Sequence, residues 1–162
     1  MNKNTLHDVY LGLGSNLGDK ENNIHSALEK INEKIGRVIS LSSFYITDPV
    51  GFISENTFIN AACHVQTRLE PLAILQLTQD IEKELGRITK SKNNKYSDRT
   101  IDIDILMFDN IILNSEPLVL PHPHLHDRSF VILPLEEIAS NIQHPVLNKT
   151  IGEIRKDFEK NV

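Results

Sequence analysis

Residues 8–36, DVYLGLGSNLGDKENNIHSALEKINEKIG, predict a strand that runs through a glycine-rich turn into a helix. The strand, Asp8 to Leu13, has a period of two, so that one of its faces carries Val9, Leu11 and Leu13. The helix, Lys20 to Ile35, has apolar residues at helical spacing, namely Ile24, Ala27, Leu28, Ile31 and Ile35. Asp19 can cap its first turn, and Gly36 suits a left-handed residue at its end.

The rest of the chain also mixes strands and helices. The expected strands are Val38–Tyr45, Phe58–Thr67 and TIDIDILMF at residues 100–108, with a long loop over residues 47–57. An Asp109-Asn110 turn and the short run IILN after the third strand predict a hairpin. The expected helices are one that starts after Glu70 and Pro71 and ends at Gly86, one over Phe130–Ala139, and one over Thr150–Phe158. The apolar face expected for the first of them carries Leu72, Leu75, Ile81 and Leu85.

These elements favour an α+β fold in one domain over residues 1–162. A chain of 162 residues with 40% apolar and 24% charged residues can bury one core and is too short for two comfortable domains. The order of the elements fits a ferredoxin-like β-α-β-β-α-β sandwich. We therefore expect a mainly antiparallel sheet with helices packed on it, an added hairpin and a C-terminal helix.

Composition limits the partners and the compartment. The formal net charge of −5 argues against nucleic-acid binding through the overall field, so an anion site has to be local. Cys63 is the only cysteine, which excludes an intramolecular disulfide and fits a reducing cytoplasm. The N-terminus lacks the apolar stretch of a signal peptide, and no run of about 18 apolar residues is present to cross a bilayer. We expect a cytoplasmic monomer with no nucleic-acid or membrane partner.

Asp102 and Asp104 are the strongest local signal for chemistry. On a strand, residues two apart point the same way, so both carboxylates project from one face while Ile101, Ile103 and Ile105 cover the core side. Like charges on one face repel, and Mg²⁺ commonly compensates them by binding one or two carboxylates, water and substrate phosphates. The alternative is a solvated strand face that is simply acidic.

A basic segment precedes the two acids. Over residues 87–99 the chain has one acid, Asp98, and five basic residues, which are Arg87, Lys90, Lys92, Lys95 and Arg99. Such a segment suits a polyphosphate held by Mg²⁺, with arginines that neutralise the charge developing during phosphoryl transfer. A solvated charged loop explains the run equally well when the run is taken alone.

The glycine-rich turn does not match a nucleotide-binding fingerprint. Gly12, Gly14 and Gly18 have the spacing G-x-G-x-x-x-G, which differs from the Rossmann pattern, and no Lys followed by Ser or Thr completes a P-loop. We interpret these glycines as allowing close packing of the strand against the helix, with a secondary role in shaping a pocket.

Residues 121–130, PHPHLHDRSF, place His122, His124 and His126 at alternate positions. Alternating histidines can ligate a metal, and together with the two acids at 102 and 104 they could form a transition-metal site. A rigid turn with exposed imidazoles is the alternative. A single histidine that donates to a phosphate is the interpretation that we favour.

Phe58 and Asn60 share a face of their predicted strand. An aromatic ring and an amide on one face could together recognise a planar heterocycle. A core phenylalanine beside an incidental asparagine is an equally plausible interpretation.

Six motifs, in order along the chain, resemble those of the 6-hydroxymethyl-7,8-dihydropterin pyrophosphokinase family. They are GLGSNLGD, SSFYITDPVG, FINAA, DRTIDIDIL, LPHPHLHDRSF and LPLEEIAS, and the R-x-x-D-x-D segment followed by P-H-P and R-x-F is highly specific. The resemblance implies a Mg-dependent diphosphokinase of tetrahydrofolate biosynthesis. Such an enzyme transfers the β,γ-diphosphate of ATP to the hydroxyl of 6-hydroxymethyl-7,8-dihydropterin, which gives AMP and the pterin diphosphate.

The resemblance also implies roles for individual residues. Asp102 and Asp104 would hold two Mg²⁺ ions that bridge the ATP phosphates and the attacking hydroxyl, and Arg87 and Arg99 would complete the catalytic set. The ATP-binding positions implied are Gln79, Glu82, Arg87, Tyr96, Arg99, Ile105, His122 and Arg128. The pterin-binding positions implied are Thr47, Val50, Phe58, Asn60 and Phe130, with the two phenylalanines on either side of the ring. The expected mechanism is in-line displacement driven by positioning and charge neutralisation.

Two rival classes of protein remain open. A metal hydrolase would use His122, His124 and His126 as ligands. A non-catalytic ferredoxin-like regulatory module would bind a small ligand and turn nothing over, but it has no use for Asp102, Asp104 and the adjacent arginines together.

Overall fold

A computed structural model describes residues 4–47, 57–86 and 100–160 of the chain. The strands are β1 His7–Ser15, β2 Arg37–Leu41, β3 Tyr45–Thr47, β4 Phe58–Thr67, β5 Asp102–Phe108, β6 Leu113–Asn114 and β7 Val119–Leu120. The helices are α1 Lys20–Lys34, α2 Pro71–Glu84, α3 Ser129–Ala139 and α4 Ile151–Lys160. Within the described residues, no helix combines the length and apolar character that crossing a membrane requires.

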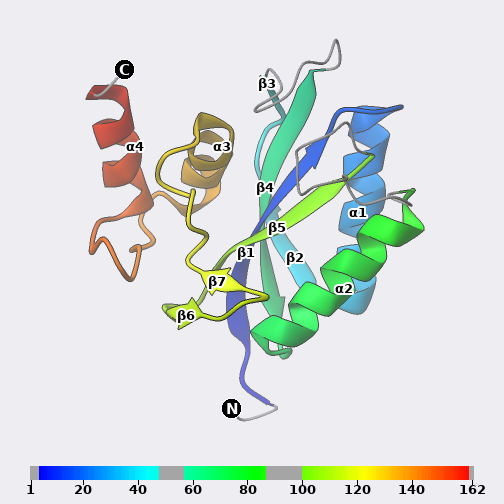
Figure 1. Ribbon diagram of the computed structural model, residues 1–162, viewed down its shortest axis with the longest axis horizontal. Coiled ribbons are helices and arrows are strands. Elements are labelled where there is room, and N and C mark those ends of the chain that lie inside the picture. Colours follow the sequence, from blue (N-terminus) through cyan, green and yellow to red (C-terminus); the bar gives the residue numbers. More distant parts are fainter. Residues whose placement is uncertain (1–3, 48–56, 87–99, 161–162) are drawn as a thin grey trace.

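The main sheet has the strand order β2-β4-β1-β5, and every adjacent pair in it is antiparallel (Figure 1). The short strand β3 pairs with β4 beyond the end of β2. With α1 between β1 and β2, with α2 between β4 and β5, and with β2 and β3 counted as one interrupted strand, this is a β-α-β-β-α-β arrangement. The ferredoxin-like core predicted from the element order is therefore confirmed.

Helices cover both faces of this sheet: α1 and α2 lie on one side, and α3 lies on the other with α4 packed against it (Figure 1). The central strand β1 consequently buries both of its faces. Its residues Val9, Leu11 and Leu13 join one apolar cluster with residues of α1 and α2, as the period of two predicts. Its residue Tyr10 joins a second cluster, formed with α3 and α4.

The two ends of α1 are fixed by different means. Asp19 caps the start, as expected, because its carboxylate accepts a hydrogen bond from the Asn22 N–H at 3.2 Å. Gly36 is not in the left-handed conformation that we expected, since the described glycines with positive φ are Gly18 and Gly86. A Cβ at Gly36 would lie 2.1 Å from the carbonyl oxygen of Gln66, so the position requires glycine because β4 passes directly against it.

The sequence-based boundaries fail in two other places. The predicted strand Val38–Tyr45 is split into β2 and β3 at Ser42, whose side-chain oxygen accepts from the Ala62 N–H at 2.9 Å and whose N–H donates to the Ala62 carbonyl at 2.9 Å. The predicted apolar face of α2 is confirmed at Ile81, which is fully buried, and at Leu75 and Leu85, which pack against the core. It is wrong at Leu72, which is 54% exposed, and it omits Ile74, which is fully buried.

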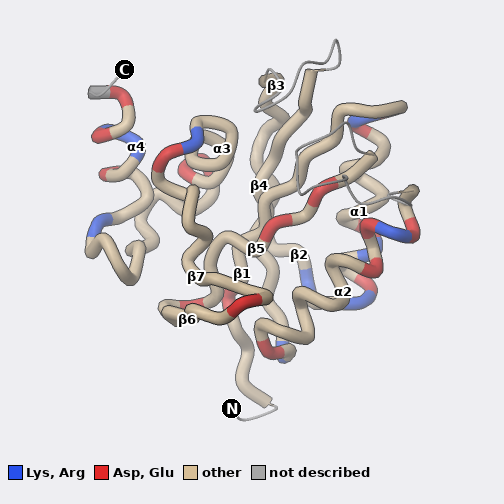
Figure 2. The backbone as a smooth tube through the Cα atoms, viewed as in Figure 1, with Lys and Arg blue, Asp and Glu red and all other residues tan. Residues whose placement is uncertain are grey.

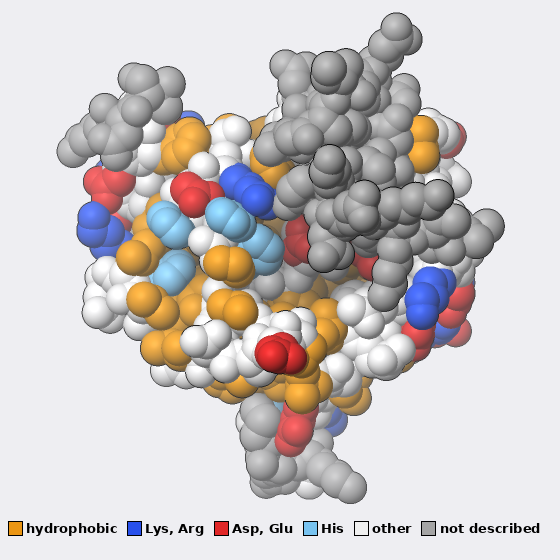
Figure 3. Space-filling model, viewed as in Figure 1, with side chains coloured by type: hydrophobic (Ala, Val, Ile, Leu, Met, Phe, Trp, Pro, Cys, Tyr) orange, Lys and Arg blue, Asp and Glu red, His pale blue; other side chains and the backbone are white. Residues whose placement is uncertain are grey.

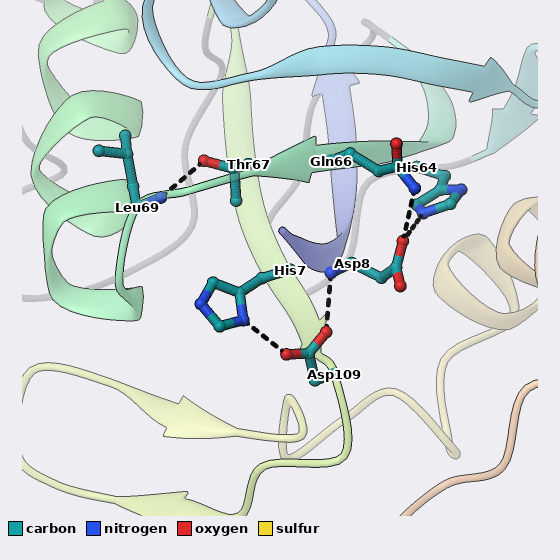
Figure 4. A network of polar contacts seen from close by, with 7 residues as sticks. All are labelled: His7, Asp8, His64, Gln66, Thr67, Leu69 and Asp109. Atoms are coloured by element: carbon teal, nitrogen blue, oxygen red, sulfur yellow. Dashed lines mark hydrogen bonds and ion pairs between the residues drawn. The ribbon is translucent and has the colours of Figure 1, made fainter. Parts of the chain in front are cut away.

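The predicted hairpin between residues 100–108 and 111–114 is wrong, because β5 pairs with β1 and β6 pairs with β7. A polar network at Asp109 accounts for the change of direction (Figure 4). Asp109 has a φ of 47°, and its carboxylate accepts from the Asp8 N–H at 2.7 Å and contacts His7 Nδ1 at 2.7 Å. Asp8 in turn contacts His64 Nε2 at 2.7 Å. The turn after β5 is thus tied to the start of β1.

Gly36→Ala should destabilise the protein by about 2–4 kcal/mol, because the added methyl group meets a backbone carbonyl that cannot move without displacing β4. Urea unfolding followed by circular dichroism measures the change. Gly12→Ala is the matched control, since its Cβ would lie 3.5 Å from the Leu106 side chain, an ordinary contact distance. Equal stability of the two variants would contradict this explanation of Gly36.

Candidate active site

A pocket that is partly open to solvent lies between the sheet and α3. Its walls come from β1, β3, β4 and β5 on the sheet side and from Phe130, Val131 and Pro134 on the helix side. The segments that form it are far apart in the sequence. The pairing of the strands and the packing of α3 are what bring them together.

The floor of the pocket is built from very small residues of β1. Gly14 lies directly opposite Asn60 of β4 on one side and Asp102 of β5 on the other. Gly12 lies in the same way between Ala62 and Asp104. Directly opposed residues of antiparallel strands share a face, so the acids and the amide flank a strip without side chains.

Gly12 and Gly14 have the pocket-shaping role that we expected only as a secondary one. A Cβ on Gly14 would lie 3.0 Å from Asn60 Oδ1, and a Cβ on Gly12 would lie 3.5 Å from Leu106, a residue of the pocket side. These two glycines open the floor of the pocket and do not serve the packing of β1 against α1. Gly18 differs, because its φ of 69° marks the turn before the helix.

Asp102 and Asp104 both line the pocket, and Ile101, Ile103 and Ile105 are buried in the apolar cluster on the opposite face. Figure 2 shows acidic positions in red along β5. The strand face predicted for the two acids is thus confirmed. Carboxylate oxygens at the edge of a solvent-accessible pocket are donors that suit Mg²⁺. In the described part of the chain, no group of three or more His, Cys, Asp or Glu residues is placed to hold a metal. Such a pair suits an ion that takes its other ligands from water or substrate oxygens.

Four of the five residues expected to recognise the pterin line this same pocket: Thr47, Phe58, Asn60 and Phe130. Asn60 is 6% exposed, and its Nδ2 donates to Thr47 Oγ1 at 2.7 Å, which fixes the orientation of the amide. Phe58 comes from the sheet and Phe130 from α3, so aromatic rings are available on both walls. The fifth residue, Val50, lies outside the described residues.

His122 is not among the residues that line the pocket; it lines the second groove described below, and two hydrogen bonds fix its orientation. The backbone N–H of His122 donates to the Leu106 carbonyl at 2.9 Å, and the ring Nδ1 of His122 accepts from the backbone N–H of His124 at 3.1 Å. Burial lowers the pKa of His122 to about 4, assisted by the positive charge of Arg128 and opposed by Asp102. The imidazole is therefore neutral at physiological pH, and its remaining proton is on Nε2, where it can be donated to an anion.

The other histidines of this segment have different partners. His124 Nδ1 contacts Asp127 at 3.2 Å, and His126 lies with His144 and exposed apolar side chains in a second, shallower groove. Histidine side chains gather on this face among hydrophobic ones (Figure 3). His144 Nδ1 accepts from two backbone N–H groups, those of Val146 and Leu147. These contacts do not assemble the metal centre that the rival hydrolase hypothesis requires.

The residues expected to bind ATP are spread over several elements. Glu82 of α2 is 8% exposed, and its carboxylate accepts from the Ile103 N–H at 2.8 Å on the outer edge of β5. Gln79 is exposed on α2, and Ile105 is 4% exposed, with its side chain in the core on the face away from the pocket. The Arg128 guanidinium carbon lies 5.8 Å from the centre of the Phe130 ring. Three further expected residues lie outside the described residues: Arg87, Tyr96 and Arg99.

Sequence reasoning missed several residues of the site. Val131 and Pro134 line the helix wall, and Glu137, also on α3, bonds to Ser43 just before β3 and to Tyr45 of β3. The helical spacing of Phe130 and Pro134, four residues apart, was a usable signal that they share a helix face. Nothing local in the sequence indicates the partners of Glu137, because they are more than 90 residues away along the chain.

Comparison with known proteins identifies the family. The sequence model described as 7,8-dihydro-6-hydroxymethylpterin-pyrophosphokinase matches residues 10–140. The chain is 47% identical over 132 residues to the 2-amino-4-hydroxy-6-hydroxymethyldihydropteridine pyrophosphokinase of Porphyromonas gingivalis, which covers 81% of this chain and 90% of the relative. It is 39% identical over 136 residues to the enzyme of the same name from Bacillus subtilis, with 83% of this chain and 80% of the relative covered.

Solved structures agree on the fold. A crystal structure of an HPPK-DHPS in complex with substrates has a TM-score of 0.74 at 17% identity and covers 97% of this chain. The wild-type HPPK-DHPS of Plasmodium falciparum with pterin and p-hydroxybenzoate has a TM-score of 0.73 at 20% identity and covers 99% of it. This chain spans 44% and 42% of those two longer chains. Taken with the family match over residues 10–140, the fold and the pocket lead to one conclusion: the chain belongs to the 7,8-dihydro-6-hydroxymethylpterin-pyrophosphokinase family.

Proposed function

We propose that this protein transfers the β,γ-diphosphate of ATP to the hydroxyl of 6-hydroxymethyl-7,8-dihydropterin, giving AMP and the pterin diphosphate in tetrahydrofolate biosynthesis. One observation carries the proposal beyond family membership. Asp102 and Asp104 line the same pocket as the Asn60 amide and the aromatic rings of Phe58 and Phe130. A pocket of this kind suits a flat, polar heterocycle whose reacting group has to meet a metal-bound polyphosphate.

The pterin ring binds between Phe58 and Phe130. Aromatic rings on two walls offer stacking to both faces of the heterocycle, and the Asn60 amide offers a donor and an acceptor to its edge. The bond from Asn60 to Thr47 orients that amide before the substrate arrives. Val50, outside the described residues, completes the set of pterin contacts in this proposal.

Asp102 and Asp104 hold Mg²⁺, and the proposal assigns them two ions. When bound, the ions neutralise the charge of the ATP phosphates and favour loss of the proton from the pterin hydroxyl. The two residues suit this role because Gly12, directly opposite Asp104, leaves room for the phosphates at the strand face. The two aspartates, together with Arg87 and Arg99, form the catalytic set.

Diphosphate transfer forms a bond between the pterin oxygen and the β-phosphorus of ATP. It breaks the bond between that phosphorus and the oxygen that leaves with AMP, and the hydroxyl proton is released. The protein contributes positioning and charge neutralisation. His122 donates from its neutral imidazole to the polyphosphate, and Arg128 adds a positive charge next to it.

The remaining nucleotide contacts are proposed at Gln79, Glu82, Tyr96 and Ile105. Because the Ile105 side chain is buried away from the pocket, its contribution comes from its backbone. Glu82 fixes the edge of β5 next to that backbone through its bond to the Ile103 N–H.

We also propose that residues 1–162 form one pyrophosphokinase domain that acts as a monomer in the cytoplasm. Burial raises the pKa of the single cysteine, Cys63, to about 12, so its thiol stays protonated and unreactive. A buried, unreactive thiol is compatible with a reducing compartment. ATP and the pterin are the proposed partners, with no role for nucleic acid or a membrane.

Asp104→Asn should lower kcat/KM for the pterin by about 100-fold or more, because the neutral amide holds Mg²⁺ much more weakly than a carboxylate does. AMP formation at saturating MgATP measures the loss, and circular dichroism checks the fold. Asp127→Asn is the control, since it removes the same charge from an exposed residue that contacts His124. Near-normal activity of Asp104→Asn would overturn the metal assignment.

Gly14→Ala should raise the KM for the pterin by about tenfold, because the new methyl group pushes on Asn60 Oδ1 from 3.0 Å and disturbs the amide that reads the ring. The KM for MgATP should change by less than about twofold, and this provides the internal control. Steady-state kinetics with each substrate varied in turn measure both constants. Equal increases in the two KM values would contradict the assignment of Gly14 to the pterin side of the pocket.

A further inference from the structure

One carboxylate ties α3 to the segment around β3. Glu137 Oε2 accepts from the Ser43 N–H at 2.7 Å and from the Ser43 hydroxyl at 3.2 Å. Glu137 Oε1 accepts from the Tyr45 hydroxyl at 2.7 Å. Both oxygens of a single side chain are therefore used to join two elements that are distant in the sequence.

On the helix side, Glu137 belongs to the same face as the pocket wall. Phe130, Pro134 and Glu137 are spaced by four and three residues, which places them along one side of α3. Phe130 and Pro134 line the pocket. A shift of α3 at Glu137 would therefore move the aromatic wall as well.

On the sheet side, Tyr45 belongs to the row of residues that crosses the pocket floor. It lies directly opposite Asn60, which lies opposite Gly14, which lies opposite Asp102. Thr47, two residues after Tyr45, accepts the hydrogen bond that orients Asn60. The Tyr45 contact with Glu137 thus holds the end of this row that is distant from the acids.

The charge states favour a strong contact. Hydrogen bonds from Tyr45 and from the Ser43 backbone lower the pKa of Glu137, and the bond to Glu137 raises the pKa of Tyr45 to about 12. At physiological pH a charged carboxylate therefore accepts from a protonated phenol, which makes the bond charge-assisted. The carboxylate is exposed, so its bonds contribute little to global stability, but they still fix a distance.

We propose that Glu137 is a positioning residue that sets the separation between Phe130 on α3 and the Thr47–Asn60 side of the sheet, and with it the fit of the pterin ring. This inference rests on the proposed function, because the space between Phe130 and the sheet is the proposed pterin site. It assigns a role to Ser43, Tyr45 and Glu137, which lie in two of the six motifs and have no other part in the proposed mechanism.

Glu137→Ala should raise the KM for the pterin by about five- to tenfold, because all three hydrogen bonds from Ser43 and Tyr45 to α3 are lost. The kcat and the KM for MgATP should stay within about twofold of the wild type. Glu137→Gln should restore most of the pterin affinity, because its amide oxygen can accept from the Ser43 N–H while its amide N–H donates to the Tyr45 oxygen. A residue needed only for folding would lower the active fraction, and hence the apparent kcat, without changing the KM for the pterin.

We call the hydrogen bonds of Glu137 with Ser43 and Tyr45 the clamp. Two further variants distinguish the loss of the clamp from a general effect of removing a negative charge. Glu136→Ala removes the same charge from the next residue, which acts on Tyr45 through its charge, and it should leave the KM for the pterin unchanged. Tyr45→Phe should also raise the KM for the pterin. Adding Tyr45→Phe to Glu137→Ala should raise it little further, because each change already removes the hydrogen bond between Tyr45 and Glu137. An unchanged pterin KM in Glu137→Ala, or an equal rise in Glu136→Ala, would overturn the inference.

Calorimetric titration of the pterin, with Mg²⁺ and α,β-methylene-ATP present, keeps this test separate from the test of the proposed function. If the wild type forms no AMP, the proposed function is wrong, and the clamp is still judged by pterin binding. Weaker binding to Glu137→Ala than to the wild type supports the clamp. Equal binding, or no binding to either protein, overturns it.

Discussion

The sheet side of the candidate active site depends on the register between β1 and its two neighbours. Because directly opposed residues of antiparallel strands share a face, the pairing places Asn60, Gly14 and Asp102 in one row across the sheet. A shift of one residue would turn all the side chains of a strand to the other face. The register is held because the other face of β1 is packed in the core with Val9 and Leu11, so that slippage would expose this apolar surface.

The two faces of the sheet have different roles. The face toward α1 and α2 is a closed apolar core, whereas the face toward α3 leaves a pocket because β1 supplies glycines there. Asp102 and Asp104 lie on one side of the β1 glycines, and Asn60 lies on the other. In the proposed function, the metal-bound polyphosphate and the flat ring meet above these glycines. Helix α3 supplies the second wall, and Glu137 fixes where that wall stands relative to Tyr45.

The sequence predicts what depends on local period and misses what depends on distant contacts. The shared face of Asp102 and Asp104 was predictable, because a strand has a period of two whatever packs against it. The exposure of Leu72 was not, because the apolar pattern of its helix allows more than one face and the packing against the sheet selects between them. The need for glycine at position 36 and the partners of Glu137 come from strands that arrive from elsewhere in the chain. The expected reaction came from the family resemblance, because the periodicity of a sequence does not indicate which reaction an enzyme catalyses.

The central claim is that one pocket unites the acid pair with the ring-binding slot to transfer a diphosphate. The most direct measurement is a product assay with the purified protein, MgATP and 6-hydroxymethyl-7,8-dihydropterin, with the nucleotides resolved by chromatography. The account predicts AMP, formed in equal amount with the pterin diphosphate and only when the pterin is present. Formation of ADP or free phosphate in its place, or AMP that does not depend on the pterin, would contradict it.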